Sequence, residues 1–140
     1  RSIGPDKLNQ LRHVRLLRDH AGLRAHMARH RAILGPKFAL VEACLRRELA
    51  GRGLANWTTP RGGYFVSLQV RDGSARRVVA LAQELGIALV PAGKAFPLGH
   101  DPRDSHLRLA PSFPGLQELE QAMEGICLSV LLATTEEVLP

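Results

Sequence analysis

The chain has 140 residues, of which 45% are hydrophobic and 23% are charged, a composition ordinary for one globular domain with one core. No run approaches eighteen apolar residues, so neither a membrane span nor a signal peptide is expected. Residues 1–70 carry 13 Lys and Arg against 4 Asp and Glu, whereas residues 71–140 carry 6 against 9. This asymmetry is compatible with a nucleic acid or an acidic partner surface, but solvated helix faces are the simpler interpretation.

Two helices are predicted for the first part of the chain. Residues 5–17 begin with a proline that suits a first helical turn, and apolar residues recur there at three- and four-residue spacing. Asp19 is a candidate N-cap for a second, longer helix that ends near Ala50. Gly35-Pro36 interrupts its apolar stripe, which predicts a kink, or a break with re-entry at Pro36.

The second half alternates between strand and helix patterns. Residues 63–70 alternate with period two and predict a strand, and Ser74 caps a helix that continues to about Leu85. "IALVP", residues 87–91, predicts a short buried strand. The 13-residue loop "AGKAFPLGHDPRD" then leads to a third strand that ends at Pro111, and residues 116–138 predict the last helix.

These elements predict an α+β fold in the order α-α-β-α-β-β-α. The expected architecture is a small mixed sheet of about three strands covered by helices, in which the second and third strands pair antiparallel.

The cysteines and histidines indicate no metal centre. Cys44 and Cys127 lie in apolar helical stretches, which favours buried free thiols in a reducing cytoplasm. His26 and His30 are four residues apart on the long helix, but Met27 stands where a zinc-protease helix carries its glutamate. We therefore interpret both histidines as solvated.

The predicted third strand raises a question of charge. Leu107 and Leu109 share one face of this strand, and His106, Arg108 and Ala110 share the other. Arginine keeps its charge in proteins and has five donors, so Arg108 must be solvated, paired within the fold, or available to an anion. The residues alone therefore predict an α+β domain with a candidate anion site.

Four stretches carry a resemblance to a known family: "IGPDKLNQLRH", "WTTPRGGYFVSL", "LAQELGIALVPAGKAFPLGHDPRDSHLRLAPSFP" and "LEQAMEGICLSVLLA". Together they resemble the C-terminal small domain of a fold-type I, pyridoxal-phosphate-dependent aminotransferase. The similar subgroup is the class I/II branch described as MocR-type or aspartate-aminotransferase-like. The resemblance implies an amino acid and a 2-oxo acid as substrates, and a cytoplasmic homodimer when the protein is full length.

The resemblance also implies roles for particular residues. Arg108 matches the arginine that binds the α-carboxylate of the substrate in this family. Gly63 and Tyr64 match a "P-x-G-G-aromatic" element that borders the substrate cleft, and Phe96 matches a mobile segment near the site.

The cofactor pyridoxal 5'-phosphate is implied for the full-length enzyme and is not expected on this chain alone. In the family, the lysine that forms the Schiff base lies upstream of the first stretch, and Lys7, Lys37 and Lys94 do not match its motif. Residues 1–18 are then a linker helix from a missing large domain, and residues 19–140 are the small domain. Such a fragment should not transaminate alone.

Two alternatives remain open from the sequence. Some relatives are transcription regulators, in which an aminotransferase-like body senses a ligand. A basic nucleic-acid-binding module belongs to a different class, but the few aromatic residues do not interleave with the basic ones as a base-stacking platform requires.

Overall fold

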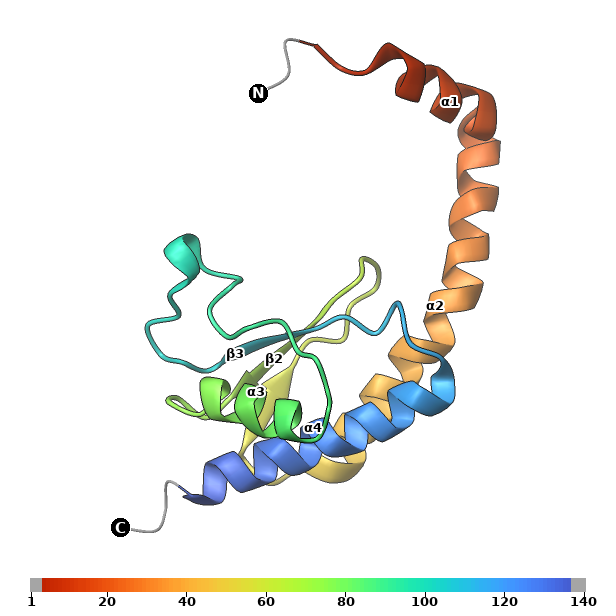
Figure 1. Ribbon diagram of the computed structural model, residues 1–140. Coiled ribbons are helices and arrows are strands. Elements are labelled where there is room, and N and C mark those ends of the chain that lie inside the picture. The colour runs from red at the N-terminus through yellow and green to blue at the C-terminus, as the bar shows by residue number, and fades with distance from the viewer. Residues whose placement is uncertain (1–3, 137–140) are drawn as a thin grey trace. The chain divides into compact units, whose positions relative to one another are not determined.

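The computed structural model describes residues 4–136 (Figure 1). In chain order the elements are α1 (Lys7–Leu17), α2 (His20–Leu49), β1 (Ala55–Trp57), β2 (Val66–Val70), α3 (Ala75–Glu84), a 3-10 turn (Pro97–Gly99), β3 (His106–Leu109) and α4 (Leu116–Glu136). The predicted α+β class is confirmed. The predicted end of the last helix, at residue 138, lies outside the described residues, as do residues 1–3 of the predicted linker helix.

The chain divides after Pro36 into two compact units. In the first unit, Asp6 caps α1 by accepting hydrogen bonds from the backbone N–H groups of Leu8 and Asn9, at 3.0 and 3.2 Å. None of residues 4–36 is buried, and most of the large apolar side chains of this unit are exposed: Leu8, Leu11, Val14, Leu16, Leu23, Met27 and Ile33. This unit therefore has no core among its described residues.

Helix α2 begins where the sequence predicted. The carboxylate of Asp19 accepts a hydrogen bond from the backbone N–H of Gly22 at 2.8 Å, as an N-cap residue does. A break at Pro36 was one of the two predicted outcomes, and it is wrong, because residues 20–49 form one α-helix with Pro36 inside it. Proline costs the helix one backbone donor, and this loss is tolerated where the surrounding turns remain bonded.

The second unit contains a three-stranded antiparallel sheet in the order β1-β2-β3. The observed element order is α-α-β-β-α-β-α, so the predicted order and the predicted mixed sheet are both corrected. Residues 87–91 do not form a strand: Ile87 and Leu89 pack against the core as side chains of a segment without a ladder partner. The strand missed by the sequence is β1, whose three residues are too few to show a period.

One face of the sheet belongs to the core. In β2 and β3 every second residue is buried, and these residues pack against α3, α4 and the last turns of α2 (Figure 1). The cysteines are buried free thiols as predicted, and burial raises the pKa of Cys127 to about 12 and also raises the pKa of Cys44. None of the helices within residues 4–136 combines the length and the apolar character that a membrane span needs.

Candidate anion site

The other face of the sheet carries polar side chains, and we call it the polar face. Ser67 lies opposite Arg108 in the β2–β3 register, and Gln69 lies opposite His106. All four are half-buried. The alternation that buries the leucines of β3 therefore places a permanent positive charge on a partly desolvated surface.

Arg108 has no anionic partner among the described residues. Its buried Nε–H group donates no hydrogen bond to the described residues, and its guanidinium forms no ion pair with them. The guanidinium carbon lies 4.4 Å from the centre of the Phe65 ring. Buried charges are normally paired, so an unpaired, half-buried guanidinium is the arrangement expected of a site that binds an anion.

The loop that carries Phe96 lies against the polar face. The hydroxyl of Ser67 and Nε2 of His106 are joined by a 2.7 Å hydrogen bond. The Phe96 ring meets the His106 ring edge-on, with 5.6 Å between their centres. The structure thus brings Phe96 beside His106, which is two residues from Arg108 on the same face of the strand.

Gly63 and Tyr64 lie in the segment that connects β1 and β2. Gly63 has a φ of +86°, a conformation that glycine adopts without a steric penalty, and Tyr64 is 53% exposed. The aromatic residue that contacts Arg108 is the next one, Phe65, which was not among the predicted site residues. The spacing in the sequence could have indicated Phe65, because it lies two residues before Ser67 and side chains two residues apart share one face of a strand.

Asp101 anchors the loop before β3, a role that no pattern in the sequence indicates. Its buried carboxylate accepts hydrogen bonds from the backbone N–H groups of Arg103, Ser105 and His106, at 3.1, 2.8 and 2.9 Å. Burial alone would raise the pKa of Asp101, but the three N–H donors outweigh it and lower the pKa. A charged Asp101 thereby fixes the backbone that leads into Arg108.

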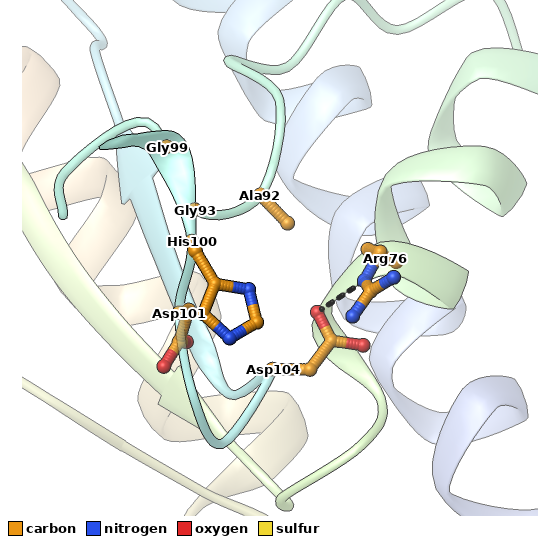
Figure 2. A pocket seen from close by; sticks show the side chains of 7 residues that line it. All are labelled: Arg76, Ala92, Gly93, Gly99, His100, Asp101 and Asp104. Atoms are coloured by element: carbon orange, nitrogen blue, oxygen red, sulfur yellow. Dashed lines mark ion pairs between the residues drawn. The ribbon is translucent and has the colours of Figure 1, made fainter. Parts of the chain in front are cut away.

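A shallow cavity of about 150 Å³ lies between this loop and the start of α3 (Figure 2). Figure 2 shows His100 and Asp104 facing the same hollow, with Arg76 paired to Asp104 at an Nε–Oδ1 distance of 3.2 Å. The charges here compensate one another, unlike that of Arg108. No group of three metal-ligating side chains occurs in the described part of the chain.

The lysines do not provide a site for an aldehyde cofactor. Lys37 donates hydrogen bonds to the backbone carbonyls of Ser112 and Phe113, at 2.7 and 3.5 Å, and Lys7 and Lys94 are exposed. The three lysines therefore give no indication of a site for pyridoxal phosphate among the described residues, and the unpaired guanidinium of Arg108 makes the polar face a candidate anion site.

A family model described as "Aspartate amino-transferase" matches residues 1–139. An aspartate aminotransferase from Corynebacterium glutamicum is 53% identical over 136 residues, which are 97% of this chain and 32% of that protein. The chain therefore spans about a third of the length of the curated relatives that it matches.

The solved structures agree with this result. An aspartate transaminase from Corynebacterium glutamicum has a TM-score of 0.91 and 52% identity, and the match covers 97% of this chain and 32% of that one. An α-aminoadipate aminotransferase from Thermus thermophilus, solved with N-(5'-phosphopyridoxyl)-L-leucine, has a TM-score of 0.70 over 81% of this chain and 28% of its own. At 23% identity, this second likeness shows the fold alone.

Proposed function

Because the chain belongs to the aspartate aminotransferase family and matches the small domain of its members, we propose that it supplies the substrate-carboxylate site of a pyridoxal-phosphate-dependent aminotransferase. The family predicted from the four sequence stretches is thereby confirmed. The proposed reaction moves an amino group between an amino acid and a 2-oxo acid, and both carry a carboxylate next to the reacting carbon. Arg108 binds that carboxylate.

The observation that carries this proposal is the unpaired guanidinium of Arg108. Two parallel N–H···O bonds from a planar guanidinium fix the orientation of a carboxylate as well as attracting its charge. Orientation matters because the reacting carbon must be held in one position relative to the cofactor. A half-buried guanidinium that already had a carboxylate partner could not do this, and Arg108 has none among the described residues.

The remaining parts of the active site belong to the rest of the protein in this proposal. The cofactor supplies the amino-transfer chemistry when it is bound, and a lysine outside these residues anchors it. Gly63, Tyr64 and Phe96 border the substrate, and the full-length protein is a homodimer. The exposed apolar side chains of residues 4–36 support the proposal that a large domain covers them in the full-length protein. The 140-residue chain is inactive alone.

The test is an Arg108→Lys substitution in the full-length protein. Lysine keeps the charge but loses the two-point geometry, and a charge-assisted hydrogen bond contributes about 1.5–3 kcal/mol. The catalytic efficiency for amino acids should therefore fall by about one to two orders of magnitude, while the absorbance of the bound cofactor remains. Steady-state kinetics and an absorbance spectrum measure both quantities.

Arg103→Lys is the matched control. Arg103 is an exposed arginine of the neighbouring loop, and its hydrogen bond to Asp101 comes from the backbone N–H and not from the side chain. Its efficiency should stay near that of the wild type. If Arg108→Lys instead lowers the melting temperature and leaves the efficiency unchanged, Arg108 is a structural residue and the carboxylate site lies elsewhere.

A further inference from the structure

Phe65 is an aromatic side chain that the core does not use. It lies immediately before β2 and is 46% exposed, whereas its neighbour Val66 is 3% exposed and faces the core. The alternation of the strand places Phe65 on the polar face together with Ser67. Because Phe65 remains about half exposed, the hydrophobic effect contributes little to holding its ring on the polar face, and its contact with Arg108 needs another explanation.

The orientation of Arg108 needs an explanation as well. An arginine side chain has several rotatable bonds, and hydrogen bonds or ion pairs usually hold its guanidinium in place. Among the described residues Arg108 has neither, and its buried Nε has no partner. The contact recorded for its guanidinium carbon is the Phe65 ring, 4.4 Å from the ring centre, well within the range of about 6 Å for a cation–π interaction.

We propose that Phe65 is the positioning residue for Arg108: its ring holds the guanidinium by a cation–π contact and leaves the N–H donors free for the substrate. A carboxylate could hold Arg108 equally firmly, but it would occupy the same donors that the substrate carboxylate needs. The face of a ring attracts the cation without accepting any of those hydrogen bonds. This inference rests on the proposed function of Arg108 and adds the residue that prepares it.

The experiment uses the full-length protein with its cofactor and three single variants. Phe65→Leu keeps an apolar side chain and removes the ring, so KM for the amino acid should rise about three- to tenfold while kcat changes less than about twofold. Phe65→Tyr keeps the ring face, and its hydroxyl can reach solvent, so KM should return to within about twofold of wild type. Phe113→Leu makes the same replacement at a phenylalanine that is 95% exposed and should leave KM unchanged.

A double-mutant cycle separates positioning from general stabilisation. In an Arg108→Gln background there is no guanidinium to hold, so Phe65→Leu should change KM by less than about 1.5-fold. An equal rise in KM in both backgrounds would overturn the inference, because Phe65 would then act without Arg108. A wild-type KM for Phe65→Leu would overturn it too. The proposed function fails separately, if Arg108→Gln by itself leaves KM unchanged.

Discussion

Two charged residues near β3 are treated in opposite ways by the fold. Asp101 is buried and accepts three backbone hydrogen bonds, so its negative charge is stabilised by donors within the fold. Arg108 is half-buried, has no anionic partner among the described residues, and contacts an aromatic ring. The first arrangement stabilises a loop, and the second keeps a charge available. This contrast is the residue-level basis for assigning one to the scaffold and the other to the substrate.

Asp101→Asn tests the scaffold role. The amide nitrogen of asparagine would face a backbone donor and would carry no charge, so the free energy of unfolding should fall by about 1–3 kcal/mol at pH 7. Urea denaturation of the full-length protein, followed by circular dichroism, measures this loss. Asp72→Asn is the control, because Asp72 is exposed in a turn, and it should change stability by less than about 0.5 kcal/mol.

The pH dependence of this effect has a definite sign. The pKa of Asp101 is lowered in the folded protein, so the stabilisation is complete above the ordinary aspartate pKa of about 3.9 and is lost as the pH falls toward the lower folded value. The difference between wild type and Asp101→Asn should therefore be largest near neutral pH and should shrink below about pH 4. A difference that grows on acidification would contradict this account of Asp101.

At the scale of elements, the sequence predicted the strands with a clear period-two pattern and missed β1, which is too short to show one. The alternation in β2 and β3 identified the buried leucines and the opposite face of Arg108 correctly. The short apolar run at residues 87–91 was misleading, because Ile87 and Leu89 pack against the core without a neighbouring strand. Pairing depends on where distant segments meet, and a local pattern does not contain that information.

The candidate site was predictable to the same extent. Arg108 was found because an arginine on an apolar strand conflicts with its surroundings, which is a local signal. The contact with Phe65 depends on the register between β2 and β3, and the hydrogen bonds of Asp101 depend on a loop conformation without a sequence period. The relation of Gly63 and Tyr64 to a substrate stays a prediction, because both are exposed in the segment that connects β1 and β2.

Helices α1 and α2 allow a prediction at this scale. Residues 7–36 bury no side chain, whereas α4 contributes Leu119, Met123 and Val130 to the core. In the 140-residue chain, amides of residues 7–36 should therefore exchange with solvent by local opening of a few kcal/mol at most, far faster than those of α4. Hydrogen exchange read by mass spectrometry compares the two segments directly.

The same measurement on the full-length protein is the matched comparison. If the large domain covers the exposed apolar side chains, residues 7–36 should become strongly protected there. Equal protection of residues 7–36 in the two proteins would contradict the proposal that the rest of the protein packs on this segment.

At the scale of the whole molecule, the chain corresponds to one part of the longer proteins in its family. It spans about a third of the length of its curated relatives, and its described residues include a candidate anion site at Arg108. In the proposed function, this part contributes a carboxylate-binding arginine on an antiparallel sheet, with an anchored loop beside it. Under that proposal this part orients the substrate, and the rest of the protein holds the cofactor.

A crystal structure of the full-length protein with an amino acid bound would show whether Arg108 binds the substrate carboxylate. We expect both carboxylate oxygens to lie about 2.7–2.9 Å from two nitrogens of the Arg108 guanidinium, which remains against the Phe65 ring. A structure in which the carboxylate lies elsewhere, or in which Arg108 is already paired with an acidic residue of the large domain, would contradict this expectation.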